Sequence, residues 1–164
     1  MKSSTFPRLY PILDSGFLAI ATEDRAAFLK DLIPGLADAG VTLLQYRNKQ
    51  GSEAEILREA RLIRSLAGDR MQLILNDWPA LAVEAGFDGV HVGQQDMTPS
   101  RAREIVGPDR IVGVSTHNEA QLRSADTGPV AYIAIGPVFS TTSKENPDPV
   151  IGLAGVTLDR KSVV

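Results

Sequence analysis

Cysteine is absent from this chain of 164 residues. Its absence excludes disulfide bonds and zinc sites ligated by cysteine, and it suits the reducing environment of the cytosol. Long apolar runs are missing as well, and the residues after Met1 do not form the apolar segment of a secretion signal. We therefore expect a soluble cytoplasmic protein without a signal peptide or a membrane-spanning segment.

An excess of positive charge is also lacking. The 17 lysines and arginines are outnumbered by 20 aspartates and glutamates, which gives a formal net charge of −3. Proteins that bind nucleic acids usually carry a basic surface, so we expect no nucleic-acid partner. No repeat or linker divides the sequence, and 43% of its residues are hydrophobic. We expect residues 1–164 to form a single domain with a substantial core.

Six short apolar runs are present, and each is followed by polar or glycine-containing residues. The runs are Leu9–Leu13, Thr42–Tyr46, Leu73–Leu75, Gly89–Val92, Ile111–Val114 and Ala131–Ile135. Several are almost continuously apolar, as strands are when helices cover both faces of a sheet. The pattern predicts an α/β protein with parallel strands, and it leaves both a (β/α)₈ barrel and a doubly wound sheet open. In either architecture the carboxyl ends of the strands share one face, where ligands bind.

Capping signals place helices between the apolar runs. The first helix extends from about Thr22 to Ala39 and contains Pro34, where we expect a kink or a break. Further helices are expected over residues 52–68, 79–85 and 98–107, and from residue 118 onward. Two of them open with a capping box, formed by Ser52 with Glu55 and by Asn118 with Gln121.

Three polar residues occupy alternate positions at the end of the second run. Gln45, Arg47 and Lys49 would lie on one side of an extended strand. An amide and two cations suit a polyanion such as diphosphate, since arginine binds two oxygens through its planar fork and lysine acts as a point charge. Alternatively, Arg47 and Lys49 are solvated loop charges.

Two aspartates follow the third and fourth runs. Asp77 and Asp96 would face each other across neighbouring strand ends, where two carboxylates can hold Mg²⁺ together with phosphate oxygens. Asp77 could instead cap the helix that begins near Pro79. Asp96 is not needed as a cap, because Thr98 is better placed for the next helix, and Gly93 lets the backbone approach a ligand closely.

Hydroxyl groups and a lysine follow the sixth run. Residues 136–144 include Thr141, Ser143 and Lys144, whose donors suit phosphate oxygens, and Lys144 could stabilise a departing diphosphate. The alternative is a mobile loop rich in serine and threonine. Of the two histidines, His91 lies within an apolar run and is expected to be a hydrogen-bonded structural residue. His117 could be structural or an acid/base group.

Five segments together resemble thiamine phosphate synthase. They occur in that family's order and spacing between about Tyr10 and Gly155, and they are Gln45–Lys49, Asn76–Asp77, Gly89–Asp96, Gly113–His117 and Gly136–Lys144. The resemblance implies a TIM barrel and a transferase of thiamine biosynthesis. Such an enzyme couples 4-amino-5-hydroxymethyl-2-methylpyrimidine diphosphate with a thiazole phosphate, giving thiamine phosphate and diphosphate.

The same resemblance implies roles for individual residues. It assigns Asp77 and Asp96 to Mg²⁺, and Ser115, Lys144 and Arg47 to catalysis. The residues implied to bind the small-molecule substrates are Gln45, Arg47, Lys49, Asn76, Ser115, Thr141, Ser143 and Lys144. The implied reaction forms a carbocation-like pyrimidine methylene, so it needs leaving-group stabilisation and positioning more than a strong base.

The sequence departs from the family pattern in composition and in length. Tyr46 stands where the family usually has leucine, Asn48 replaces an acidic residue and Ser140 replaces a proline. A complete barrel of this type needs at least about 200 residues. We therefore expect about six βα units without the last two strands. We also expect open strand edges through which copies of the chain could associate.

Two other functions stay open at this point. A thiazole tautomerase shares the family's barrel and isomerises the thiazole, with His117 as the acid/base group. A non-catalytic protein would keep the phosphate-binding residues without turnover. Gln45 and the segment Gly93–Asp96 favour the synthase over the tautomerase.

Overall fold

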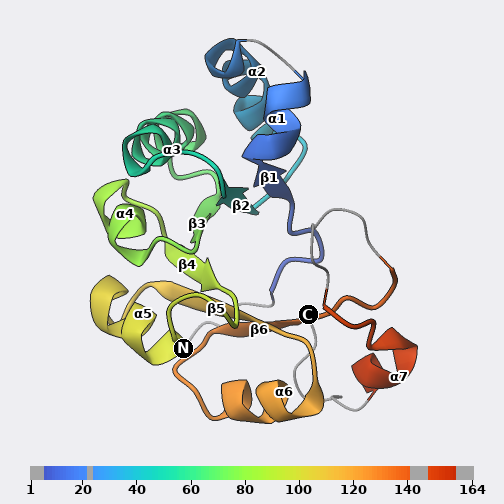
Figure 1. Ribbon diagram of the computed structural model, residues 1–164. Coiled ribbons are helices and arrows are strands. Elements are labelled where there is room, and N and C mark those ends of the chain that lie inside the picture. Colours follow the sequence, from blue (N-terminus) through green and yellow to red (C-terminus); the bar gives the residue numbers. More distant parts are fainter. Residues whose placement is uncertain (1–5, 22–23, 141–147, 158–164) are drawn as a thin grey trace. The chain divides into compact units, whose positions relative to one another are not determined.

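The computed structural model describes residues 6–21, 24–140 and 148–157 of the chain (Figure 1). Six strands alternate with helices in the order that the apolar runs predict. The strands are β1 (Ile12–Asp14), β2 (Leu43–Arg47), β3 (Gln72–Asn76), β4 (Gly89–Val92), β5 (Ile111–Thr116) and β6 (Tyr132–Ile135). The helices are α1 (Ser15–Ala21), α2 (Arg25–Asp38), α3 (Glu53–Ala67), α4 (Pro79–Glu84), α5 (Pro99–Val106), α6 (Glu119–Asp126) and α7 (Gly152–Thr157).

Strand order distinguishes between the two architectures that the sequence leaves open. The strands are hydrogen-bonded in the order β1-β2-β3-β4-β5-β6, which is also their order along the chain. The pairs β1–β2, β2–β3 and β5–β6 are parallel. A doubly wound sheet reverses its strand order at a switch point, whereas a barrel adds each strand beside the previous one. The sequential order is therefore that of an incomplete (β/α)₈-type barrel.

The chain divides into two compact units, residues 1–90 and residues 91–164, and the boundary falls within β4. In the first unit, β2 and β3 form the centre of the core, where Leu43, Tyr46 and Leu73 are at most 2% exposed. Helices α2 and α3 of this unit pack against each other (Figure 1). In the second unit, Val112 and Val114 of β5 are buried in the same way.

The helix that contains Pro34 differs from the expectation. α2 is continuous from Arg25 to Asp38, so the predicted break is wrong. A proline removes one backbone hydrogen bond, but the turns on either side keep theirs. Leu29 and Ile33, which both precede Pro34, are fully buried and anchor the helix in the core. The sequence also missed α1, which begins directly after β1, and predicted β1 too early by about three residues.

The two capping boxes have different outcomes. At α3 both bonds form: the Ser52 backbone N–H donates to Glu55, 2.8 Å, and the Glu55 N–H donates to the Ser52 hydroxyl, 3.4 Å. At α6 Asn118 accepts from the Gln121 N–H, 2.9 Å, as predicted. The Gln121 side chain, however, accepts from the backbone N–H of His117, 2.7 Å. The second box is therefore a single cap, because the Gln121 side chain is used one residue earlier.

A buried polar cluster crosses from β2 to α3. The Tyr46 hydroxyl donates to the carboxylate of Glu59, which also forms an ion pair with Arg25, 3.2 Å. Asn48 donates to the same hydroxyl, 3.2 Å, and its carbonyl oxygen accepts from the backbone N–H of Gly51, 2.8 Å. Burial, followed by the hydrogen bond to Glu59, raises the pKa of Tyr46 well above its ordinary value.

Tyr46 is expected to make the stability of the fold sensitive to alkaline pH. Its pKa is higher in the folded chain than in the unfolded chain, where tyrosine ionises near pH ~10. Its contribution is therefore complete below pH ~10 and is lost as the pH rises toward the folded pKa. Urea unfolding from about pH 8 to about pH 11 should show a fall in the free energy of unfolding, with a limiting slope of ~1.4 kcal/mol per pH unit, that Tyr46→Phe removes. If the free energy of unfolding fell equally with pH in the wild-type chain and in Tyr46→Phe, this account would be wrong.

Gly113 on β5 makes room for an aromatic ring on β6. Gly113 and Tyr132 are direct register partners. A Cβ atom at Gly113 would lie 2.0 Å from Cζ of Tyr132, so the ring crosses the position that a side chain would fill. This close approach requires a glycine, because no other residue lacks a Cβ.

Gly113→Ala is expected to destabilise the chain by ~1–3 kcal/mol, the usual cost of overpacking a core. Gly35→Ala is the matched control, because nothing lies within 4 Å of its Cβ position and it sits inside α2. It should stabilise the chain by ~0.4–1 kcal/mol. Urea denaturation measures the change in the free energy of unfolding for each variant. Equal changes at the two glycines would show that the Tyr132 ring does not require Gly113.

Candidate active site

Polar side chains of β2 pair with residues of β1 and of the segment before it in the first unit. Gln45 is 3% exposed, and its amide donates to the hydroxyl of Tyr10, 2.9 Å. Arg47 forms an ion pair with Asp14, its register partner on β1. The Arg47 side chain is 26% exposed, so it is not a freely solvated loop charge. Sequence reasoning identified Gln45 and Arg47 but assigned no partner to either, because Tyr10 and Asp14 are more than thirty positions away.

Asn76 is the last residue of β3, and Asp77 follows it directly. Asp77 has a positive φ of 70°, which no other non-glycine residue has in the described part of the chain. Its side chain is 13% exposed and forms an ion pair with Lys49. The alternative that Asp77 caps α4 is wrong, because Trp78 occupies the N-cap and no side chain caps that helix. Such backbone strain in a non-glycine residue is typical of functional sites.

Asn76 carries a buried donor without a partner. The residue is 6% exposed, and its Nδ2 atom makes no hydrogen bond. A buried unpaired donor costs ~1–3 kcal/mol, so a bound water, an ion or a ligand usually completes such a group. Asn76 therefore points to a ligand with acceptor atoms next to Asp77 and Lys49.

In the second unit, the loop after β4 is folded around Asp96. The Asp96 carboxylate accepts from the backbone N–H of Gly93, 3.0 Å, and a Cβ at Gly93 would lie 2.7 Å from that carboxylate. A side chain at Gly93 would therefore crowd the Asp96 carboxylate, whereas the predicted close approach to a ligand stays a prediction. Thr98 caps α5 by accepting from the Arg101 N–H, 3.3 Å, so Asp96 is not used as the cap.

Ser115 at the end of β5 is bonded to two side chains from β4 and the loop that follows it. Its hydroxyl lies 2.8 Å from Nε2 of His91, and its carbonyl accepts from the Gln94 amide, 2.6 Å. His91 is 7% exposed and also lies 2.9 Å from the hydroxyl of Tyr132. The prediction that His91 is a hydrogen-bonded residue is confirmed. Its contact with Ser115 was missed, because the 24 positions between them carry no local signal.

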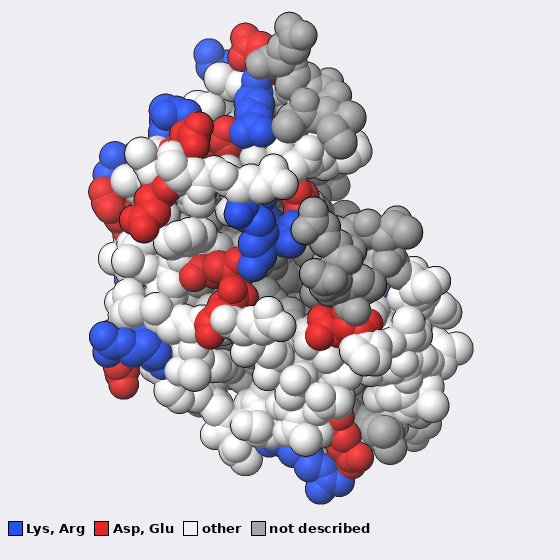
Figure 2. Space-filling view, viewed as in Figure 1, with Lys and Arg blue, Asp and Glu red and all other residues white. Residues whose placement is uncertain are grey.

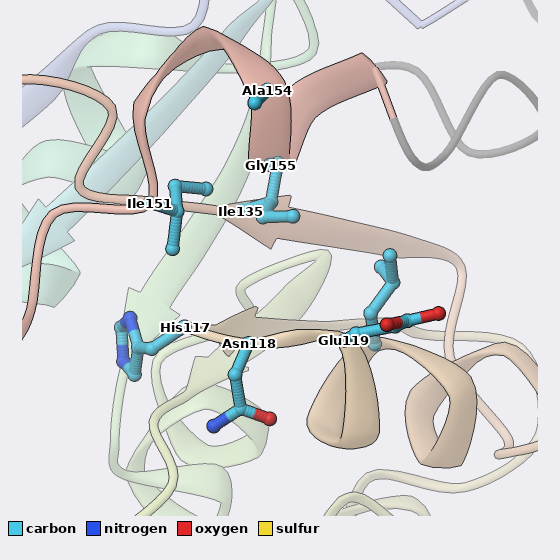
Figure 3. Close-up of a pocket in the computed structure, with 8 residues that line it drawn as sticks. His117, Asn118, Glu119, Ile135, Ile151, Ala154 and Gly155 are labelled. Carbon is cyan, nitrogen blue, oxygen red and sulfur yellow. The ribbon is translucent and has the colours of Figure 1, made fainter.

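His117 lies beside a cavity of about 320 Å³ in the second unit. Its Nδ1 is 2.6 Å from the carbonyl oxygen of Gly136, and its Nε2 is 3.3 Å from the carboxylate of Asp148. Figure 3 shows Ala154 and Gly155 of α7 on one side of the cavity, with His117 and Asn118 on the other. The lining residues are His117, Asn118, Glu119, Leu122, Ile135, Ile151, Ala154 and Gly155. Both ring nitrogens of His117 are thus held by acceptors.

Three of the predicted site residues belong to a segment that the structure does not describe. Thr141, Ser143 and Lys144 lie outside the described residues. Within the described ranges, no three His, Asp or Glu side chains gather as a metal cluster. On the face shown in Figure 2, lysine and arginine atoms lie in small groups beside aspartate and glutamate atoms. Over the same described ranges, no helix has the length and hydropathy needed to cross a bilayer.

Comparison with known sequences places the chain in a family. A sequence model described as thiamine monophosphate synthase matches residues 9–163. The thiamine-phosphate synthase of Koribacter versatilis is 51% identical over 155 residues, which are 94% of this chain and 72% of that protein. The thiamine-phosphate synthase of Agrobacterium fabrum is 38% identical over 151 residues, which are 92% of this chain and 66% of that protein.

A solved structure supports the fold. The thiamine phosphate pyrophosphorylase from Pyrococcus furiosus matches with a TM-score of 0.70 and 24% identity, over 90% of this chain and 66% of that chain. The barrel-type α/β fold predicted from the sequence is therefore confirmed, and the chain spans about two thirds to three quarters of the length of these relatives. With the family match over residues 9–163 and half of the aligned positions identical to one relative, the chain belongs to the thiamine monophosphate synthase family.

Proposed function

We propose that the chain acts in thiamine biosynthesis as a thiamine-phosphate synthase. It would couple 4-amino-5-hydroxymethyl-2-methylpyrimidine diphosphate with a thiazole phosphate, forming thiamine phosphate and diphosphate. Membership of the family supports this reaction. The structural observation that carries it is the buried, unpartnered amide of Asn76 beside the strained Asp77.

The first unit supplies the groups for the pyrimidine diphosphate. Gln45 and Asn76 are buried amides that can recognise a polar ring, and Arg47 and Lys49 are cations for phosphate oxygens. Lys49 now pairs with Asp77. A bound diphosphate would take over the lysine and leave the Asp77 carboxylate for a cation.

Asp77 and Asp96 are the residues that would hold Mg²⁺. They follow β3 and β4, which are neighbours in the strand order. One or two carboxylates plus substrate phosphate oxygens form the donor set that Mg²⁺ prefers, so the residue types fit. When bound, the cation would neutralise charge on the diphosphate.

The chain's own residues would stabilise the leaving diphosphate. Arg47 and Lys144 supply positive charge, and the hydroxyl of Ser115 supplies a hydrogen-bond donor. Thr141 and Ser143 would add donors to phosphate oxygens. The reaction breaks a C–O bond to diphosphate and forms a C–N bond to the thiazole, so charge stabilisation and alignment matter more than a strong base.

The tautomerase alternative is not favoured. It would use His117 as the acid/base group, but the carbonyl oxygen of Gly136 and the carboxylate of Asp148 hold the two ring nitrogens. The family match and the segment Gly93–Asp96 support the synthase instead.

Two expectations from the sequence stay predictions. The cytoplasmic location rests on the absence of cysteine. Association between copies rests on apolar side chains at β1, where Leu9 is 62% and Ile12 is 55% exposed.

Binding of the pyrimidine diphosphate is expected to require both Mg²⁺ and Asp96. Thermal unfolding of the wild-type chain should shift upward only when ligand and Mg²⁺ are both present, by ~2.7 kcal/mol at one hundred times the dissociation constant. Asp96→Asn should abolish the shift, whereas Asp69→Asn, an exposed control of the same chemistry, should keep it. Thiamine phosphate formation measured in the same samples separates a synthase from a protein that only binds. A shift that survives Asp96→Asn, or needs no metal, would count against the assigned cation site.

Asn76→Ala is expected to weaken ligand binding without the usual loss of fold stability. Losing a hydrogen bond to a charged or polar ligand should lower affinity ~5- to 150-fold, while removing an unpaired buried amide offsets the cost of the cavity. Asn118→Ala is the matched control: it loses the α6 cap, so it should lower stability by ~1 kcal/mol and leave affinity unchanged. Calorimetric titration and urea unfolding measure the two effects. If both variants behaved alike, the unpaired amide of Asn76 would not be a ligand contact.

A further inference from the structure

Three side chains of the second unit form a continuous hydrogen-bonded chain. The hydroxyl of Tyr132 is 2.9 Å from Nδ1 of His91, and Nε2 of His91 is 2.8 Å from the hydroxyl of Ser115. Tyr132 and His91 are 6% and 7% exposed, whereas Ser115 is only half-buried at the end of β5. This series of hydrogen bonds therefore runs from the buried interior of the unit to a group that a ligand can reach.

Packing fixes the buried end of this chain. The rings of Tyr132 and His91 are stacked, with centroids 5.5 Å apart and planes 24° apart. Tyr132 reaches His91 by crossing β5 over Gly113, where any side chain would collide with the ring. β5 and β6, which carry Gly113 and Tyr132, run side by side in Figure 1. The glycine and the stacking together hold the phenol hydroxyl at Nδ1.

The outer end is fixed through the backbone. The Gln94 side chain donates to the carbonyl oxygen of Ser115, 2.6 Å. Gln94 belongs to the same short loop as Asp96. The Ser115 hydroxyl thus has a defined position relative to His91, and its remaining freedom is the direction of its hydrogen atom.

The direction of that hydrogen depends on the tautomer of His91. A neutral imidazole has one nitrogen that donates and one that accepts. If Tyr132 donates to Nδ1, then Nε2–H donates to the serine oxygen and the serine hydrogen points elsewhere. If Nδ1–H donates to Tyr132, the serine hydrogen is used on Nε2. A phenol is a stronger acid than an alkyl alcohol, and its oxygen is a weaker acceptor, so the first arrangement is favoured.

We propose that Tyr132 holds His91 as the tautomer with hydrogen on Nε2, and that His91 thereby directs the Ser115 hydrogen toward a phosphoryl oxygen of the substrate. The identity of the ligand rests on the proposed function, whereas the tautomer does not. His91 and Tyr132 are positioning residues in this arrangement. The departing diphosphate accepts the serine hydrogen bond while its negative charge increases, which favours the transition state over the bound substrate.

The tautomer can be measured directly in the wild-type chain. Its two histidines allow ¹⁵N NMR of the imidazole nitrogens without ambiguity once His91→Asn identifies the signals. His117 is an internal reference, because a carbonyl oxygen holds its Nδ1 and requires hydrogen there. We expect hydrogen on Nε2 alone for His91 at neutral pH. Hydrogen on Nδ1 alone, or on both nitrogens, would overturn the proposal.

Two variants test which neighbour controls the tautomer. Tyr132→Phe removes the phenol donor that favours hydrogen on Nε2, so a fraction of His91 with hydrogen on Nδ1, in which the serine donates to Nε2, should appear. Ser115→Ala leaves the phenol in place and should keep hydrogen on Nε2. Tyr46→Phe removes a phenol from the first unit and should leave the His91 signals unchanged. An unchanged tautomer in folded Tyr132→Phe would overturn the role of Tyr132.

Steady-state kinetics test the effect on the reaction. Tyr132→Phe is expected to lower kcat about tenfold while KM for the pyrimidine diphosphate stays within about twofold, the pattern of an interaction that matters mainly in the transition state. A tenfold rise in KM with unchanged kcat would overturn the assignment to the departing group. If the wild-type chain forms no thiamine phosphate, the proposed function fails, and the tautomer measurement still decides whether the Tyr132–His91–Ser115 arrangement exists.

Discussion

Hydrogen bonding between consecutive parallel strands is the constraint on which the candidate site depends. Because the pairs β1–β2, β2–β3 and β5–β6 are parallel, the carboxyl ends of the strands in each pair lie at the same edge. Asp14 and Arg47 are brought together in this way as register partners, although 33 positions separate them. Ser115 likewise follows two buried valines of β5. The apolar strands supply rigidity, and the polar residues at their ends supply the chemistry.

Two of the departures from the family pattern have one structural explanation. Where the resemblance implies a leucine and an acidic residue, this chain has Tyr46 and Asn48, and the two side chains are hydrogen-bonded to each other. The phenol in turn bonds to Glu59, whose charge Arg25 balances. A buried tyrosine needs partners for its hydroxyl, and a carboxylate at position 48 would place a second negative charge close to Glu59. With Tyr46 and Asn48 together, the buried hydroxyl has hydrogen-bond partners and no second negative charge lies beside Glu59.

The candidate site residues of the two units differ in chemical type. Cations and buried amides predominate among the candidate residues of the first unit, including Arg47, Lys49 and Asn76. The second unit contributes Ser115, whose hydroxyl is oriented through His91 and Tyr132. In the first unit the strained Asp77 and the unpaired Asn76 amide are features that folding alone does not favour. Their persistence is easier to understand if a ligand completes the site.

The sequence by itself determined the order of strands and helices, most of the caps and the family, because these depend on local periodicity and on motifs that are read along the chain. It identified Gln45, Asn76, Asp96 and Ser115 as residues at strand ends for the same reason. A break at Pro34 was the wrong expectation, because α2 continues through that residue. The apolar pattern alone left the strand order open, and the tertiary structure has the barrel order that the family resemblance implied. Only the tertiary structure decided that Lys49 faces Asp77. It also decided that His91 joins Tyr132 to Ser115, since these contacts depend on strand pairing between positions far apart in the chain.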